Sequence, residues 1–262
     1  MQSLRRVFLL LILGISAASA QDWPQKTLRI VVPFPAGGSA DLIPRVVAEK
    51  LAQQWSQPVI VENRPGAAGN IGADVVFKSE PDGYMLLSAP PPPLVINRLL
   101  YPNLSYDPTQ FTPITVIAAI PNVLLVHPKV PASNVAELIA YAKANPGKLN
   151  YASQGSGSTS HLTAELFKSM AGNLQIMHVP YKGTAPALAD LVGGQVDMMC
   201  DNLGVSLPHV KGGRLRALAV GSRARSPALP DVPTLSETLR GFEAVAWFGI
   251  VAPPQTPGPV AE

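Results

Sequence analysis

The feature that most constrains the fold of this chain is a short apolar strand that runs into a glycine-rich loop and then a helix. Residues 28–32 (LRIVV) are mostly β-branched, which is typical of a strand buried on both faces. Pro33, Pro35 and the pair Gly37-Gly38 then end the strand, and apolar residues recur at helical spacing from Ala40 onward.

The start of this helix is a candidate anion site. Ser39 or Asp41 is expected to cap it, as short polar side chains commonly do. Free backbone N–H groups and the positive end of the helix dipole would bind an anion there without a charged side chain. The loop is not a P-loop, because no Lys followed by Ser or Thr comes after the glycines. A tight turn that only connects strand and helix is the competing interpretation.

A second loop of the same kind occupies residues 153–161 (SQGSGSTSH), between an expected strand at 149–153 and an expected helix. Neither this loop nor residues 33–41 contains Lys or Arg. A phosphate with nearly two charges usually recruits one of these side chains, so two uncharged loops favour a single carboxylate.

The N-terminus predicts export. Arg5 and Arg6 precede an apolar segment at 7–15, and Ala18-Ser19-Ala20 is a small-residue cleavage site. These features predict a signal peptide over residues 1–20 that is cut after Ala20, and therefore a periplasmic protein. Its removal leaves 18 of the 20 Lys and Arg against 17 Asp and Glu, which argues against nucleic acid as a partner.

Strands and helices alternate along the chain and predict an α/β fold with mostly parallel sheets. The first series has strands at 58–62 and 84–88 around a helix at 69–78, and the second series lies within 134–220. Between them, residues 112–119 and 122–126 are expected to be two strands that cross between domains. Two series with a glycine-rich loop each indicate the two lobes of a periplasmic binding protein, whose closure is a hinge motion.

The four prolines at 90–93 interrupt this alternation, just after the strand at 84–88. They predict a stiff polyproline segment rather than a helix. This segment is expected to form either one wall of a ligand cleft or a rigid surface turn.

The sequence contains no recognisable catalytic constellation. No G-x-S-x-G motif occurs, and the histidines outside the second loop have no ligand-type spacing to carboxylates. Cys200 ends an apolar strand, where a buried, inert thiol is the usual state. We therefore predict a binding protein and not an enzyme, with no catalytic residue, metal or cofactor.

Several motifs resemble those of the Bug family of extracytoplasmic solute receptors, the binding proteins of tripartite tricarboxylate transporters. The resemblance runs from Trp23-Pro24 to the last residue. The segments that carry it are residues 30–41 (IVVPFPAGGSAD), 61–67 (VENRPGA), 81–84 (PDGY), 106–108 (YDP), 179–183 (VPYKG) and 193–197 (GGQVD).

The resemblance implies a two-lobed Venus flytrap fold that grips a small carboxylate, partly through ordered water. The lobes are expected at 21–122 and 123–246, with a return segment to the first lobe at 247–262. The ligand-binding residues that it implies are Phe34, Gly38, Ser39 and Asp41 in the first loop, and Ser153, Gly155, Ser156, Gly157, Thr159 and His161 in the second. Asp201 is expected either to face the far end of the ligand or to cap a helix from Leu203.

The chain departs from the family pattern in two places. The prolines at 90–93 stand where the family has small polar residues, which predicts a drier and stiffer cleft wall. Family members continue beyond the position of Glu262 into helices that cover the first lobe, so these C-terminal helices are expected to be missing here.

The resemblance implies a monomer that delivers its ligand to the membrane permease subunits of a tripartite tricarboxylate transporter. The alternative is a sensory receptor that presents its closed shape to a membrane sensor kinase. The sequence does not separate these two functions, because both partners would read the closed shape.

Overall fold

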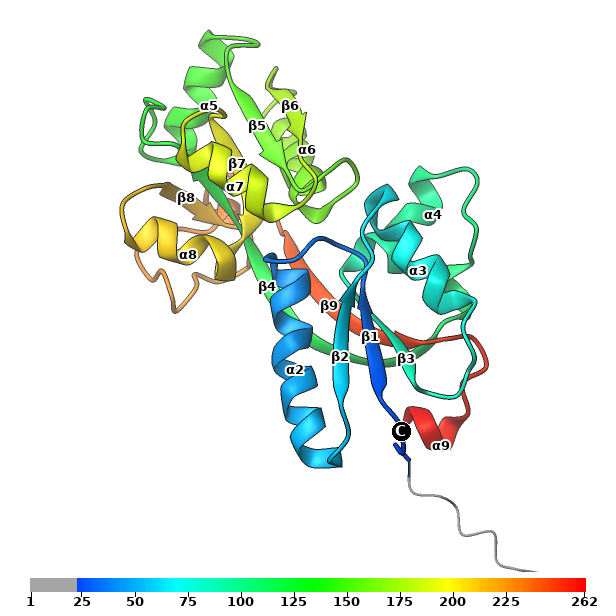
Figure 1. Cartoon of the computed structure of the whole chain (residues 1–262). Coiled ribbons are helices and arrows are strands. Elements are labelled where there is room, and N and C mark those ends of the chain that lie inside the picture. The colour runs from blue at the N-terminus through cyan, green and yellow to red at the C-terminus, as the bar shows by residue number, and fades with distance from the viewer. Residues whose placement is uncertain (1–22) are drawn as a thin grey trace, which may run out of the picture.

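The computed structural model describes residues 23–262, so the expected signal peptide lies outside the described residues. Figure 1 shows two α/β lobes joined by long strands. In the first lobe the strand order is β2-β1-β3-β9-β4, with β1 parallel to β2 and β3. Its elements are β1 (Leu28–Val32), α2 (Ser39–Trp55), β2 (Val59–Asn63), α3 (Asn70–Phe77), β3 (Met85–Ala89) and α4 (Asn97–Leu100).

The second lobe repeats the same kind of architecture. Strand β5 is parallel to β6 and β7, while β7 and β8 pair antiparallel with the end of β4. Its elements are α5 (Val135–Ala144), β5 (Asn150–Ser153), α6 (Thr159–Met170), β6 (Met177–Pro180), α7 (Thr184–Val192), β7 (Met198–Asn202), α8 (Leu203–Lys211) and β8 (Arg216–Val220).

Two antiparallel strands, β4 (Thr112–Val126) and β9 (Val245–Ala252), connect the lobes. The expectation of two separate strands at 112–119 and 122–126 is wrong, because β4 runs without a break through Pro121. Up to Pro121 the strand pairs with β9, and from Asn122 it pairs with β7. The missing N–H of proline is tolerated here because Pro121 is the last residue of one ladder.

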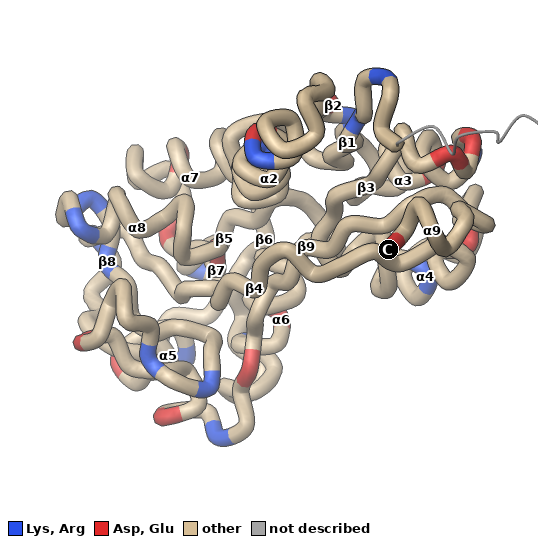
Figure 2. Tube along the Cα trace, turned by 90° about the horizontal axis from the view of Figure 1, so that it is seen from below, with Lys and Arg blue, Asp and Glu red and all other residues tan. Residues whose placement is uncertain are grey.

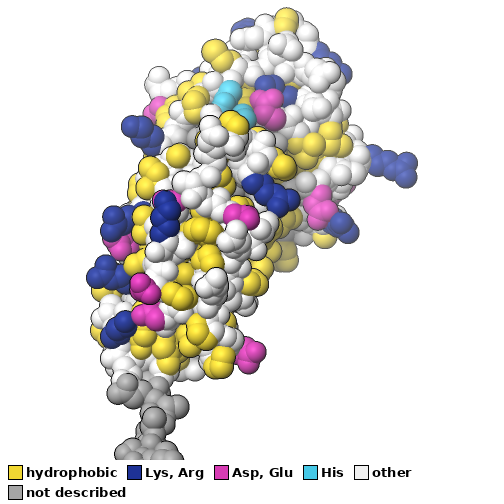
Figure 3. Space-filling model, turned by 90° about the vertical axis from the view of Figure 1, so that its right-hand side faces the viewer, with side chains coloured by type: hydrophobic (Ala, Val, Ile, Leu, Met, Phe, Trp, Pro, Cys, Tyr) yellow, Lys and Arg dark blue, Asp and Glu magenta, His cyan; other side chains and the backbone are white. Residues whose placement is uncertain are grey.

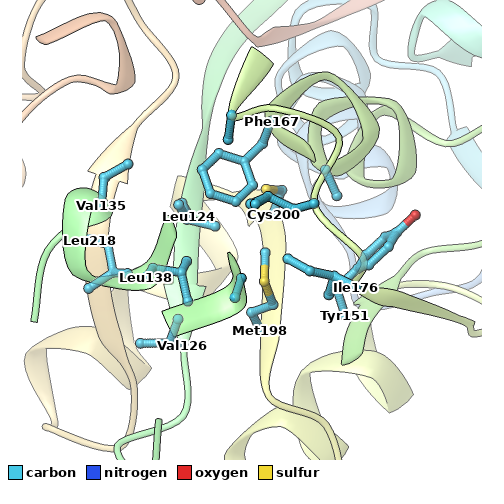
Figure 4. Close-up of a cluster of buried hydrophobic side chains, with 14 of the residues drawn as sticks. Leu124, Val126, Val135, Leu138, Tyr151, Phe167, Ile176, Met198, Cys200 and Leu218 are labelled. Atoms are coloured by element: carbon cyan, nitrogen blue, oxygen red, sulfur yellow. The ribbon is translucent and has the colours of Figure 1, made fainter. Parts of the chain in front are cut away.

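Both faces of each sheet are covered, which gives each lobe two apolar cores. Figure 4 shows the largest of the four cores, where side chains from β4, β5 and β7 pack against α5 and α6. A second core lies on the opposite face of this sheet, beneath α7 and α8. In the first lobe, α3 covers one face and α2 the other. A short helix, α9 (Gly258–Ala261), follows β9.

The four prolines at 90–93 do not form a polyproline segment, so that prediction is wrong. Pro91 is already helical (φ −50°, ψ −36°), and a wide helical turn at Pro92–Ile96 leads directly into α4. The first residues of a helix have no intrahelical acceptor for their N–H groups, so prolines there lose no hydrogen bond.

Charged side chains are distributed over the helices and loops of both lobes, with the two signs interspersed, as Figure 2 shows. In the described part of the chain no helix is both long and apolar enough to span a bilayer.

The core of the second lobe gives a stability prediction. Leu124 in β4 is fully buried, and Leu124→Ala is expected to lower the free energy of unfolding by about 2–5 kcal/mol through lost burial and a residual cavity. Met177→Ala is the control, since Met177 is 60% exposed on β6. Urea denaturation of both variants tests this, and equal destabilisation would contradict it.

Candidate functional site

The carboxyl ends of the parallel strands of both lobes face a cleft between them. One cavity in this cleft, here called the inner cavity, has a volume of about 20 Å³, which is room for about one water molecule. The segments after β1, β3, β5 and β6 and the end of β7 all contribute to it. Its lining residues are Phe34, Pro35, Gly38, Ser39, Ala40, Pro90, Pro92, Gln154, Ser158, Thr159, Gly183, Thr184, Asn202 and Phe248. This is where an open α/β sheet is expected to bind ligands.

Four helices begin at the inner cavity. Ser39, Thr159 and Thr184 are the first residues of α2, α6 and α7, and Asn202 directly precedes α8. The first N–H groups of a helix have no acceptor within it, and each helix start carries about half a positive charge. Of the described residues that line this cavity, none is charged. The cavity is therefore electropositive through its backbone alone.

A second cavity, here called the outer cavity, lies beyond Phe34 and has a volume of about 440 Å³. The two cavities share Phe34, Pro35, Gln154, Ser158 and Gly183, so they form one continuous cleft. The other lining residues of the outer cavity are Pro33, Pro65, Gly66, Ala67, Ala68, Gly69, Gly155, Ser156, Tyr181 and Lys182. Lys182 is thus the one cation that either set of lining residues contains.

The residues predicted in the first loop divide into two groups. Phe34, Gly38 and Ser39 line the inner cavity, as expected of cleft residues. Asp41 does not line either cavity and does not cap α2; the cap position is Gly38, with no capping side chain. The expectation that Ser39 or Asp41 caps the helix is therefore wrong.

Asp41 holds the loop in place from behind. Its carboxylate accepts hydrogen bonds from the Gly37 amide (3.1 Å), the Arg45 guanidinium (2.9 Å) and Asn63 Nδ2 (2.8 Å). Burial by itself would raise the pKa of Asp41, but these hydrogen bonds together lower it. The Gly37 N–H is consequently not free for a ligand.

The second loop shows the same division. Thr159 lines the inner cavity, and Gly155 and Ser156 line the outer one. Ser153, Gly157 and His161 line neither cavity. The Gly155 N–H donates to Ser153 Oγ (3.1 Å) and the Gly157 N–H to His161 Nδ1 (3.2 Å), so the loop uses these amides internally.

The supporting histidines form a stack. The rings of His161 and His178 lie 4.3 Å apart between centroids, and Tyr151 stacks on His178 at 4.7 Å. Figure 3 shows histidine side chains at the surface of the second lobe, beside acidic and basic groups. Burial lowers the pKa of both histidines, and the neighbouring His161 helps to lower that of His178 to about 4.

Ser153 and His178 come within hydrogen-bond distance, which their sequence spacing did not indicate. Ser153 Oγ lies 2.7 Å from His178 Nε2, but Ser153 is fully buried and also accepts the Gly155 amide. A nucleophile must reach its substrate. This pair therefore supports the loop. Across residues 23–262, no three His, Cys, Asp or Glu side chains are placed to hold a metal ion.

Asp201 lies inside β7 and is fully buried, which corrects both roles expected of it. The strand continues past Cys200 to Asn202, and Asp201 lines neither cavity and is not the cap residue of α8, which is Asn202. Sequence reasoning also missed Gly183, Thr184, Asn202 and Phe248. The glycine before the helix at Thr184 repeats the strand, glycine and helix pattern of the first two loops and was a usable signal.

The lobes touch through glycines on both sides of the cleft. A Cβ at Gly38 would lie 2.9 Å from Thr184 Oγ1, and one at Gly183 would lie 3.1 Å from Pro35 Cγ. A Cβ at Gly157 would lie 3.2 Å from Leu100 Cδ1. The structure is therefore that of a closed cleft.

Two α/β lobes that share the long strand β4 and close over a cleft of strand ends define the periplasmic-binding-protein fold of solute receptors. The chain belongs to the tripartite tricarboxylate transporter receptor family, which it matches over residues 43–262. Members of this family are periplasmic receptors. This confirms the family resemblance, the two-lobed α/β fold and the solute-binding function predicted from the sequence.

Three relatives illustrate the match. The protein BugT of Bordetella pertussis is 41% identical over 247 residues, covering 93% of this chain and 76% of BugT. The R. palustris protein Rpa4515, solved with adipate, is 42% identical with a TM-score of 0.89, covering 92% of this chain and 81% of its own. MatC of Rhodopseudomonas palustris, solved with bound malate, is 35% identical with a TM-score of 0.86, covering 91% and 82%.

The lobe contact at Gly38 gives a prediction about closure. Gly38 has an ordinary extended backbone (φ −93°, ψ 172°), so Gly38→Ala is tolerated locally, but its methyl group would collide with Thr184. We expect this variant to lose the closed population. Spin labels on Lys50→Cys and Lys211→Cys, which are exposed and lie in different lobes, would report the distance between the lobes. The native Cys200 is buried and should not be labelled.

Thr184→Ala in the same protein is expected to restore part of the closed population, because it removes the oxygen that the new methyl group meets. The Thr184→Ala single variant is the matched control. A distance distribution that Gly38→Ala leaves unchanged would show that this contact does not limit closure.

The histidine stack predicts a loss of stability in acid. Because the pKa of His178 is about 4 in the folded protein and ordinarily 6.5, the unfolded chain binds its proton first as the pH falls. The contribution of this pKa difference to the free energy of unfolding is complete above pH 6.5. It is lost as the pH falls from about 6.5 to 4, by up to ~1.4 kcal/mol per pH unit for one such group. His178→Phe keeps the stacking and should lose less stability between pH 7.5 and 5 in urea titrations. An equal loss in both proteins would contradict this.

Proposed function

We propose that this chain is a periplasmic receptor that binds a small organic carboxylate in the cleft, with its carboxylate group at the inner cavity, and delivers it to the permease subunits of a tripartite tricarboxylate transporter. The observation that carries the proposal is the convergence of four helix starts on a cavity without charged side chains. A carboxylate suits this arrangement because it carries one charge and accepts several N–H hydrogen bonds. Two of the solved relatives contain adipate and malate, which are small organic carboxylates.

The contacts follow from the lining residues. The amides of Ser39, Thr159 and Thr184 would hold the carboxylate, and Phe34 and Phe248 would contact the ligand body. The other predicted residues would not touch the ligand but would fix the loops by hydrogen bonds behind the cleft: Asp41, Ser153, Gly157, His161 and Asp201. The lobes at 21–122 and 123–246, with the return segment 247–262, would move as bodies about β4 and β9.

The proposal also covers export, oligomeric state and the fate of the ligand. The chain would be exported by residues 1–20, cut after Ala20, act as a monomer and release its ligand unchanged. The family assignment favours delivery to a transporter over the sensor-kinase alternative.

A thermal-shift screen of small mono- and dicarboxylates tests the proposal. A ligand of this site at 100 times its Kd should stabilise the protein by ~2.7 kcal/mol. Recovery of the ligand by mass spectrometry checks that it is not chemically changed. The proposal fails if no carboxylate stabilises the protein.

A proline substitution tests whether backbone amides hold the carboxylate. Proline is tolerated as the first residue of a helix, and Ser158 before it already has the extended backbone that proline requires (φ −66°, ψ 161°). Thr159→Pro removes one N–H at the inner cavity and should weaken binding about 10- to 100-fold, the loss of one charge-assisted hydrogen bond. Isothermal titration calorimetry measures this.

Two controls accompany that variant. Thr159→Ala removes the side-chain hydroxyl but keeps the amide, and is expected to bind much better than Thr159→Pro. Lys182→Ala removes the one cation of the cleft lining and should have a small effect. If Lys182→Ala alone abolishes binding, the carboxylate is held by a salt bridge and the amide mechanism is wrong.

A further inference from the structure

Asp201 is a buried carboxylate without a cation. It is fully buried in β7, and among residues 23–262 no Lys, Arg or His forms an ion pair with it. Its partners are neutral donors: Ser206 Oγ at 2.8 Å from Oδ2, and Gln154 Nε2 at 2.7 Å from Oδ1. Burial raises the pKa of Asp201 to about 6, and these hydrogen bonds oppose that rise, so the group is mainly ionised at neutral pH.

Gln154 is the side chain through which Asp201 reaches the cleft. It lines both the inner and the outer cavity, next to Phe34 and Ser158. An ionised carboxylate only accepts hydrogen bonds, so it fixes the nitrogen of the Gln154 amide toward the interior. The carbonyl oxygen is on the other arm of the amide, and no described residue donates a hydrogen bond to it. A hydrogen bond from the amide nitrogen to a charged acceptor also strengthens the carbonyl oxygen as an acceptor.

An acceptor at this place is unexpected in a cavity built to attract anions. It repels a bare carboxylate and attracts a hydroxyl or an ammonium group. We propose that Asp201 is a positioning residue that turns the carbonyl oxygen of Gln154 toward the cleft, so that the receptor selects carboxylates carrying a hydrogen-bond donor. This inference rests on the proposed carboxylate-binding function and specifies which carboxylates are preferred.

The isosteric variant Asp201→Asn is expected to reverse the Gln154 amide. In this variant Ser206 still donates a hydrogen bond to the place that Asp201 Oδ2 occupies in the wild type. The single side-chain oxygen of the new Asn therefore takes that place. Its nitrogen then occupies the position of Oδ1 and donates to the Gln154 carbonyl oxygen, which turns the Gln154 nitrogen toward the cleft. The shape of the site is kept, and only the hydrogen-bonding character of Gln154 changes.

The test compares acids that differ by one hydroxyl group: malate with succinate, and 2-hydroxyadipate with adipate. In whichever pair binds, calorimetry on the wild-type protein should show that the hydroxylated acid binds about 3- to 10-fold more tightly than the acid without the hydroxyl. This difference corresponds to one hydrogen bond. Asp201→Asn should bring this ratio to about one or reverse it. Gln154→Met, which has no hydrogen-bonding amide, should also abolish the preference, and adding Asp201→Asn to it should change nothing further.

The outcomes separate the two proposals. If both acids of a pair bind equally well to the wild type, or if Asp201→Asn leaves the ratio unchanged, the inference is overturned while the receptor function stands. A uniform loss of affinity in Asp201→Asn, with the ratio kept, assigns Asp201 a structural role only. If neither pair binds, the comparison is repeated with the hydroxylated and unhydroxylated forms of the acid found in the thermal-shift screen; if no carboxylate binds, the carboxylate function fails and the inference fails with it. Gln154→Met decides the question if Asp201→Asn does not fold.

Discussion

The antiparallel pairing of β4 with β9 is the interaction on which the rest of the structure depends. Strand β4 is shared by both lobes: it pairs with β9 in the first sheet up to Pro121 and enters the second sheet at Asn122. The backbone of Asn122 is held at that point by Ala244 and Gly221, at 3.1 and 2.6 Å. Because both sheets contain β4, the carboxyl ends of the parallel strands face each other across the cleft. The helix starts that follow those strands are therefore brought to one cavity.

This arrangement separates the groups that face a ligand from those that hold the loops. The two carboxylates close to the cleft, on Asp41 and Asp201, are buried and satisfied by neighbouring donors. The inner cavity itself is lined by backbone amides, hydroxyls, side-chain amides and apolar rings. Fixed dipoles of this kind need no mobile cation, and their direction is set by the fold. Specificity can then be tuned by the neutral side chains around the amides without changing the anion site.

Much of the fold could be predicted from local sequence pattern, because strand, glycine and helix signals act over a few residues. The strand expected at 28–32 is β1, and the strand expected at 84–88 is β3, which is shifted by one residue. The site was less predictable. Asp41 belongs to a strong motif, but the direction in which its carboxylate faces depends on Asn63, which is 22 residues away in the chain. The prolines at 90–93 were misjudged because the composition favours polyproline, while Leu94 and the buried Asn97 after them pack as a helix.

The glycine contacts between the lobes have a consequence for how the receptor responds to its ligand. The contacts between the lobes at Gly38, Gly157 and Gly183 are here called the seam. These glycines contribute no side-chain atoms to it, so the lobes attract each other weakly across the seam. The free energy that separates open from closed molecules then comes mainly from whatever fills the cleft. Moving such an equilibrium from 1:99 to 99:1 requires about 5.5 kcal/mol of differential binding. A receptor with a weak seam therefore reports occupancy: its shape changes with solute concentration, and few empty molecules present the closed form to the membrane partner.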